Sequence, residues 1–241
     1  MTLIDIVMPD GNAEAHLTGS GPGVLFFIDA IGLRPQIERM ADRIAAWGYT
    51  VLAPNTLYRS GTAAATSPDG DLTVPGAREA FFEQVGPRLG ALTPAAMTRD
   101  IPRYLAALRE HCAGDEVGVV GYCMGARLAV RAANLDPAVV AAAGFHGGGL
   151  VTDDADSPHA GLPRARAEFV FGHADQDRSM TPEAVERLGQ ALAEAGLTAT
   201  NEIYPGSPHG YTMNDTSMYD QTGAERSFVE LRALLGRTLN A

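Results

Sequence analysis

Cys123 is the residue whose type and surroundings best suit nucleophilic chemistry. It lies in Gly121-Tyr122-Cys123-Met124-Gly125, directly after the apolar run Val117–Val120 and directly before Ala126–Ala133, a good helix-forming segment. A strand, a tight turn with flanking glycines and a helix form the context of a nucleophile elbow, here with cysteine in place of the commoner serine. The glycines fit this role because the nucleophile has a strained backbone and the strand and helix close around it. The alternative is a buried structural cysteine.

A cysteine is a strong nucleophile only as a thiolate, so it needs a base or a lowered pKa. The helix that begins near Met124 favours negative charge at its N-terminus. His209 follows the last predicted strand and precedes the last predicted helix, and it can take the thiol proton and return it to a leaving group. We therefore predict that His209 is the catalytic base. The alternative is an exposed turn histidine beside Pro208.

A carboxylate on a preceding loop would hold the His209 imidazole in the correct tautomer. Asp175 follows the predicted strand Ala167–Gly172 at the usual distance, and Asp177 lies closer to the next helix. We predict Asp175 in this role, with Asp177 as the alternative. The chain order of nucleophile, acid and histidine is the order of α/β-hydrolases.

The elements that must position these residues alternate along the chain. Thr2–Met8 and Ala13–Thr18 are predicted to form an N-terminal antiparallel hairpin, because Pro9–Asn12 has strong turn chemistry. Strands are then expected at 24–28, 49–53, 117–120, 139–145, 167–172 and 198–204, and helices at 34–47, 77–90, 94–111, 126–133, 181–195 and 223–239. The stretch Leu57–Val74 is predicted to be a long surface loop. This alternation predicts a single α/β domain over residues 1–241, with a mostly parallel sheet and helices on both faces. Ligands bind such sheets at the carboxyl ends of the strands.

The amino-acid composition argues against some classes of binding partner. The chain has 241 residues, of which 46 % are hydrophobic and 20 % charged, and a formal net charge of −11. This charge argues against nucleic acid or an anionic membrane as a partner. Two cysteines make no disulfide framework, no signal segment is apparent at Met1–Ile6, and no apolar run is long enough for a membrane span. We expect a cytoplasmic monomer.

Three segments together resemble the dienelactone hydrolase family: the elbow Gly121–Gly125, the Asp175 loop and His209-Gly210-Tyr211. The likeness extends from about Val24 to the C-terminus. It implies the α/β-hydrolase fold and a Cys-His-Asp triad that cleaves esters and lactones through an acyl-enzyme, without metal or cofactor. It also implies an oxyanion hole made by the backbone N–H groups of Met124 and Ala30.

Two residues near the expected site differ from the family pattern or extend it. The family has a glutamate at the end of the first parallel strand, where this chain has Asp29. Asp29 is a candidate for tuning the thiol, and its alternative is a strand-end turn residue. His146 ends the strand Val139–Phe145 and is a candidate substrate contact, with a hydrogen-bonded structural histidine as the alternative.

The arginine that dienelactone-specific members carry just after the histidine is missing. Thr212 and Met213 occupy that position, and neither can pair with a substrate carboxylate. Arg59 and Arg78 are candidates to replace it.

The sequence thus favours a hydrolase acting on a small carboxylic ester or lactone. The alternatives are a broad carboxylesterase or thioesterase, a redox-reactive thiol protein, and a non-catalytic interaction module. Cys112 is expected on the helix before the elbow strand, away from Cys123, which argues against a resolving cysteine.

Overall fold

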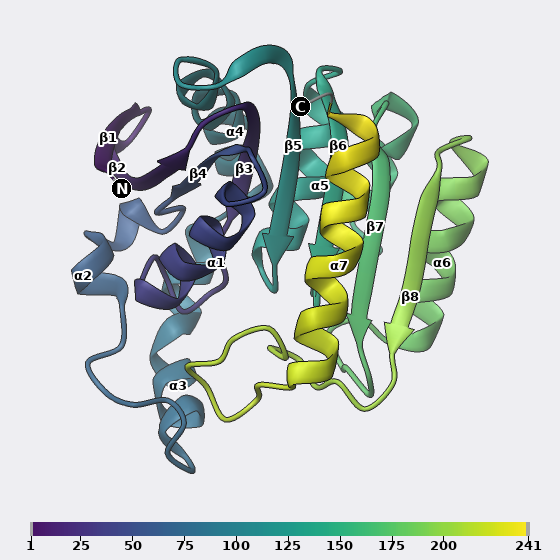
Figure 1. Cartoon of the computed structure of the whole chain (residues 1–241). Coiled ribbons are helices and arrows are strands. Elements are labelled where there is room, and N and C mark those ends of the chain that lie inside the picture. The colour runs from purple at the N-terminus through teal and green to yellow at the C-terminus, as the bar shows by residue number, and fades with distance from the viewer. Residues whose placement is uncertain (1, 240–241) are drawn as a thin grey trace.

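The computed structural model describes residues 2–239, in which eight strands form one sheet in the order β1-β2-β4-β3-β5-β6-β7-β8 (Figure 1). The hairpin β1–β2 is antiparallel, β2 is antiparallel to β4, and all later neighbours are parallel. The strands are β1 (Thr2–Met8), β2 (Gly11–Gly19), β3 (Pro22–Phe27), β4 (Thr50–Pro54), β5 (Ala113–Tyr122), β6 (Val139–Phe145), β7 (Glu168–Ala174) and β8 (Ala199–Tyr204). The parallel strands therefore bring their carboxyl ends to one edge, at the bottom of Figure 1.

Helices cover both faces of the sheet. In Figure 1, α1 (Pro35–Ala45) and α7 (Gln221–Thr238) lie in front of it, and α4 (Pro94–Arg109), α5 (Gly125–Leu135) and α6 (Pro182–Glu194) lie behind it. The two front helices are joined by an ion pair between Arg43 and Glu225, and Trp47 stands edge-on to Phe228. The central strand β3 is apolar because both of its faces are covered; its Leu25 and Phe26, for example, are fully buried.

The helix α3 (Ala77–Gly90) differs from these, because it lies beyond the carboxyl edge of the sheet rather than on a face (Figure 1). Of its 14 residues only Val85 is buried. Arg88 near its end donates to the carbonyl oxygen of Thr66 at 2.6 Å. Its side chains Phe81, Phe82 and Leu89 are only partly buried against the core, so the helix is attached through few buried groups.

The predicted architecture is confirmed: the chain has an N-terminal antiparallel hairpin and a mostly parallel sheet with helices on both faces. Two segments differ from the prediction. The stretch Leu57–Val74 is not a plain loop, since it contains the 3₁₀ turn η1 (Tyr58–Ser60) and the short helix α2 (Ala63–Thr66). A second 3₁₀ segment, η2 (Pro158–Arg164), follows β6. No helix within residues 2–239 is long and apolar enough to cross a membrane.

Candidate active site

Cys123 lies on a strained turn between β5 and α5. Its φ of 53° is in the left-handed region, which is rare for a residue with a side chain, and its N–H donates to the carbonyl oxygen of Phe145 at 3.0 Å. The two glycines around it are required by space. A Cβ on Gly121 would lie 2.1 Å from the carbonyl oxygen of Gly125, and one on Gly125 would lie 2.3 Å from that of Phe27. The predicted elbow is therefore present.

His209 lies in the loop between β8 and α7 and connects the cysteine to a carboxylate. Its Nε2 atom is 3.0 Å from Sγ of Cys123, and its Nδ1 atom is 2.6 Å from Oδ2 of Asp177. The Asp177 side chain is only 5 % exposed, and its Oδ1 atom accepts hydrogen bonds from the backbone N–H and the hydroxyl of Ser179. The arrangement joins a thiol, an imidazole and a fixed carboxylate in one chain of polar contacts.

The prediction that Asp175 orients His209 is wrong, and the alternative residue Asp177 lies beside the ring instead. The reason is that β7 continues to Ala174, two residues past its predicted end. The N–H of Asp175 consequently donates to the carbonyl oxygen of Ser207, and its Oδ2 atom accepts from the N–H of Gly206 at 2.9 Å. A turn through Gln176, whose φ is 53°, then follows and precedes Asp177.

The charges around His209 favour its protonated form. Burial lowers the pKa of His209, but the negative charges of Cys123 and Asp177 and the hydrogen bonds to them outweigh burial and raise this pKa to about 10. Burial also raises the pKa of Asp177, yet its hydrogen bonds to His209 and Ser179 leave this pKa below its usual value. The geometry therefore suits a thiolate–imidazolium pair held by a carboxylate.

The backbone N–H groups of Ala30 and Met124 have no acceptor among residues 2–239. Both residues line the same pocket as Cys123. The N–H of the neighbouring Ile31 is bonded to Oδ1 of Asp29, so the turn after β3 uses that donor and leaves the N–H of Ala30 free. Two free N–H groups beside a nucleophile are what an oxyanion hole requires.

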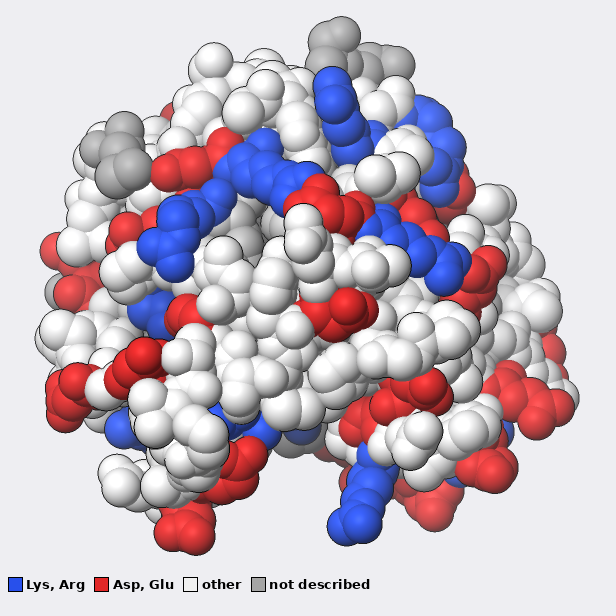
Figure 2. All heavy atoms as spheres, turned by 60° about the horizontal axis from the view of Figure 1, so that its bottom comes forward, with Lys and Arg blue, Asp and Glu red and all other residues white. Residues whose placement is uncertain are grey.

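The pocket at Cys123 has a volume of about 470 Å³. The elbow and the loops that follow the strands form its floor, while α3 contributes Phe82 and Leu89 to its wall. Figure 2 shows this end of the molecule, where arginine and acidic side chains are interspersed; every blue side chain is arginine, because the chain contains no lysine.

The pocket wall also contains arginines. Arg78, Arg127 and Arg178 line it, and none of them forms an ion pair with a carboxylate in the described part of the chain. The Arg78 guanidinium lies 4.7 Å from the centroid of the Phe82 ring. Burial lowers the pKa of Arg127, and its Nε atom is buried without a partner among residues 2–239. A Cβ on Gly149 would lie 3.5 Å from Cδ of Arg127, an ordinary van der Waals distance, so the glycine loop lies beside this side chain.

Two other candidates from the sequence, Asp29 and Arg59, are already paired with other residues. Asp29 is buried, and its carboxylate is bound to Arg34 and to the N–H of Ile31. Arg59 is paired with Asp10 and Asp100, so it is not available to a substrate. Of the two arginine candidates, only Arg78 lines the pocket.

His146, the candidate substrate contact, is fully buried and does not line the pocket. This favours the alternative role of a hydrogen-bonded structural histidine. Its Nε2 atom is 2.7 Å from Oγ1 of Thr212, and its ring packs edge-on against those of His209 and Tyr211. Burial, and then the charge of His209, hold the pKa of His146 well below its usual value, so it is neutral.

Sequence reasoning missed Arg127 and Arg34. Arg127 follows Cys123 by four residues, which is one helical turn, and this spacing was a usable signal. Arg34 had no such signal, because its second partner, Asp215, is 181 residues away along the chain.

Sequence comparison relates the chain to known hydrolases. A sequence profile of the dienelactone hydrolase family matches residues 12–239. The carboxymethylenebutenolidase of Rhodococcus opacus is 27 % identical over 198 residues, covering 80 % of this chain and 71 % of that protein. A carboxymethylenebutenolidase homolog of Mus musculus is 24 % identical over 223 residues, covering 90 % of this chain and 82 % of that protein.

Solved structures show the same fold. A dienelactone hydrolase from Anabaena variabilis superimposes with a TM-score of 0.64 at 16 % identity, over 99 % of this chain and 98 % of that one. A dienelactone hydrolase candidate from Klebsiella pneumoniae gives a TM-score of 0.79 at 20 % identity, over 98 % of each chain. With the profile match over most of its length, the chain belongs to the dienelactone hydrolase family of α/β-hydrolases.

Proposed function

We propose that this hydrolase cleaves a carboxylic ester or lactone through an acyl-enzyme on Cys123. The observation that carries the proposal is the contact series from Sγ of Cys123 to Nε2 of His209 and from Nδ1 to Asp177. A thiol beside an imidazole that is oriented by a buried carboxylate is the arrangement of an activated nucleophile.

In the first half-reaction, His209 holds the proton of the Cys123 thiol and the thiolate attacks the substrate carbonyl carbon. The negative oxygen that forms is stabilised by the N–H groups of Met124 and Ala30. Collapse of this intermediate re-forms the carbonyl and breaks the bond to the leaving oxygen, which takes the proton from Nε2 of His209. The product of this step is a thioester on Cys123 and a free alcohol, or a ring-opened hydroxyl in a lactone.

In the second half-reaction, a water molecule attacks the thioester and His209 accepts its proton. The same two N–H groups stabilise the second intermediate. The thiolate leaves, the carboxylic acid is released and the proton stays on His209, which restores the starting pair. Asp177 keeps Nδ1 protonated throughout and stabilises the imidazolium.

The arginines in the pocket favour a substrate that carries a negative charge. Arg78, Arg127 and Arg178 line the cavity without carboxylate partners in the described residues, so their positive charges are available to a substrate carboxylate. The relatives named carboxymethylenebutenolidase are, by that name, enzymes of a carboxylated butenolide. We therefore favour an ester or lactone with a carboxylate group over the alternative of broad carboxylesterase or thioesterase activity.

No observation favours a redox role for the thiol. Cys112 lies at the amino end of β5, whereas Cys123 follows its carboxyl end, so the two are separated by the length of the strand. A disulfide between them would require the strand to be broken.

The test is hydrolysis of a panel of paired aryl esters and lactones, each with and without a carboxylate, by the wild type and by Cys123→Ala, His209→Ala and Cys112→Ala. We expect turnover by the wild type and by Cys112→Ala and its loss in the other two. Mass spectrometry of quenched reactions should show the acyl mass on the peptide that contains Cys123. Undiminished turnover by Cys123→Ala would overturn the mechanism.

A further inference from the structure

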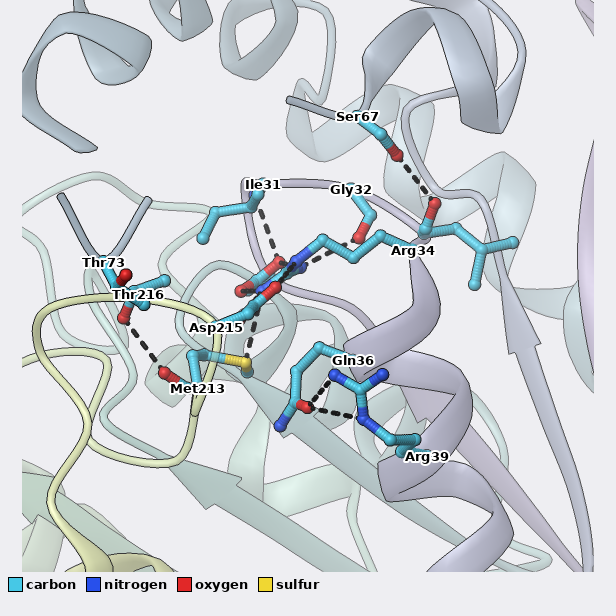
Figure 3. A network of polar contacts seen from close by, with 12 residues as sticks. Ile31, Gly32, Arg34, Gln36, Arg39, Ser67, Thr73, Met213, Asp215 and Thr216 are labelled. Carbon is cyan, nitrogen blue, oxygen red and sulfur yellow. Dashed lines mark hydrogen bonds and ion pairs between the residues drawn. The ribbon is translucent and has the colours of Figure 1, made fainter. Parts of the chain in front are cut away.

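A single buried guanidinium connects two loops of the active site. The Arg34 side chain is 3 % exposed, and its Nη1 and Nη2 atoms lie 2.7 Å and 3.1 Å from the two carboxylate oxygens of Asp29. Its Nε and Nη2 atoms lie 2.6 Å and 3.1 Å from the carboxylate oxygens of Asp215. Nη1 also donates to the carbonyl oxygen of Gly32 at 3.0 Å, and Figure 3 shows Arg34 directed at both Gly32 and Asp215.

The first of these loops contains a proposed oxyanion donor. Asp29 immediately precedes Ala30, and the same Oδ1 atom that binds Arg34 accepts the N–H of Ile31. Arg34 therefore holds the loop at Asp29 and Gly32, on either side of Ala30. Both contacts lie within two residues of Ala30.

The second loop carries His209. Asp215 follows the histidine by six residues, and the chain between them folds through hydrogen bonds from the N–H of Tyr211 to Pro208 and from that of Met213 to Gly210. The Met213 sulfur lies 3.6 Å from Nη2 of Arg34. The guanidinium thus contacts this loop at two places.

The contacts of Arg34 constrain the orientation of the two carboxylates in addition to contributing to stability. A buried ion pair recovers its desolvation cost only when its hydrogen bonds are well aligned, and an apolar replacement is often equally stable. Arg34 is planar and binds two carboxylates, each through two nitrogens, so it fixes their relative orientation as well as their distance. Because one carboxylate lies in each loop, the guanidinium fixes the loops relative to each other.

We propose that Arg34 is a positioning residue that fixes the N–H of Ala30, the proposed oxyanion donor, relative to the loop that carries His209. This inference rests on the proposed function. It requires that the transition state uses both loops at once, whereas formation of the Cys123 thiolate uses only the His209 loop. Loss of the Arg34 contacts should therefore weaken stabilisation of the oxyanion more than it affects the reactivity of the thiol.

The test compares Arg34→Lys and Asp215→Asn with the wild type. Lysine keeps the charge but cannot bind two carboxylates bidentately, and Asp215→Asn leaves the pair of Arg34 with Asp29 in place, so it serves if Arg34→Lys does not fold. The control is Arg39→Lys, an exposed arginine on α1 whose side chain is bonded to Gln36. All variants carry Cys112→Ala, so that only Cys123 is alkylated.

We expect kcat per alkylatable Cys123 to fall by about 10- to 100-fold in both test variants, with little change in KM, because a misplacement of about 1 Å can cost about 100-fold and removal of a donor costs more. The affinity for a trifluoromethyl ketone should fall by a similar factor, because addition of the thiolate turns its carbonyl oxygen into an oxyanion in the same hole. The rate of iodoacetamide alkylation and its pH profile should stay at the wild-type values.

A merely structural role predicts a different result. It would lower the melting temperature or the alkylatable fraction and leave turnover and ketone affinity per intact site equal to those of Arg39→Lys, which would overturn the proposal. Failure of the proposed function has its own signature, since the wild type would then show no turnover that depends on Cys123.

Discussion

Nδ1 of His209 lies 2.6 Å from Oδ2 of Asp177, while the carboxylate of Asp175 binds the backbone N–H of Gly206 instead. The two aspartates are separated by one residue, yet they have different surroundings and different proposed roles. Asp177 is almost completely buried beside the imidazole, whereas Asp175 secures the turn after β8.

Exchanging each aspartate for asparagine should separate these roles. Asp177→Asn removes the charge that stabilises the imidazolium and permits the wrong tautomer, so we expect kcat to fall on the order of 100-fold or more. Asp175→Asn keeps an acceptor for Gly206 and leaves the contacts of His209 in place, so kcat should stay within about threefold of the wild type, a change of less than about 0.7 kcal/mol in the barrier. Steady-state kinetics on one ester substrate measure both effects. A larger loss in Asp175→Asn would contradict the assignment.

The choice between Asp175 and Asp177 could not be made from the sequence alone, whereas the other two residues of the triad could be predicted. The elbow around Cys123 and the position of His209 could be predicted because glycine spacing and the alternation of strands and helices are local signals. The triad acid depends on where β7 ends, and strand ends are set by pairing with neighbours. Pairing with β8 continues to Ala174, opposite Tyr204, and this shifts the loop by two residues.

Contacts between residues far apart in the sequence could not be predicted, for another reason. Arg34 precedes a helix and has the appearance of an ordinary polar residue, and only the fold brings Asp215 to it. Asp29 could be recognised as a strand-end residue, but its partner could not. The shape of the pocket wall, with Phe82 and Leu89 of α3, is likewise set by tertiary packing.

Arg127 provides a test of charge recognition. We expect Arg127→Met to reduce kcat/KM for a carboxylate-bearing ester by about 10- to 100-fold, the worth of a hydrogen bond to a charged group. The neutral ester of each pair should be affected much less. Arg131→Met is the matched control, because Arg131 lies one turn later on α5, outside the pocket at Cys123, and donates to the backbone oxygen of Asp156. Equal losses on both substrates would argue against charge recognition by Arg127.

The raised pKa of His209 predicts a pH-dependent contribution to stability. Protonation is favoured in the folded state, where the pKa is about 10, over the unfolded state, where it is near the ordinary value of 6.5. The contribution is therefore fully present below pH 6.5 and is lost as the pH rises toward 10. Melting temperatures of the wild type and His209→Gln, measured from about pH 6 to about pH 10, should converge with increasing pH. A constant difference across this range would contradict the assigned shift.

The elbow itself can be tested through Gly125. A Cβ there would lie 2.3 Å from the carbonyl oxygen of Phe27 and 2.6 Å from that of Ile28, and backbone atoms cannot yield as a flexible side chain can. We expect Gly125→Ala to lower the free energy of unfolding by about 3 kcal/mol or more, at the upper end for overpacking. Gly236→Ala in α7 is the control, since a Cβ at that position would meet no atom within 4 Å, and it should be neutral or stabilising by up to about 1 kcal/mol. Urea denaturation measures both, and equal stabilities would contradict the steric account.

The weak attachment of α3 divides the pocket into parts of unequal stiffness. Its floor is formed by the elbow at Cys123, which directly follows β5 of the sheet, whereas the wall at Phe82 and Leu89 belongs to a helix with one buried residue. Segments with so few buried groups open locally at low free-energy cost. Selectivity is therefore expected to be strict for the part of a substrate that lies against the floor and tolerant of bulk on the side of α3.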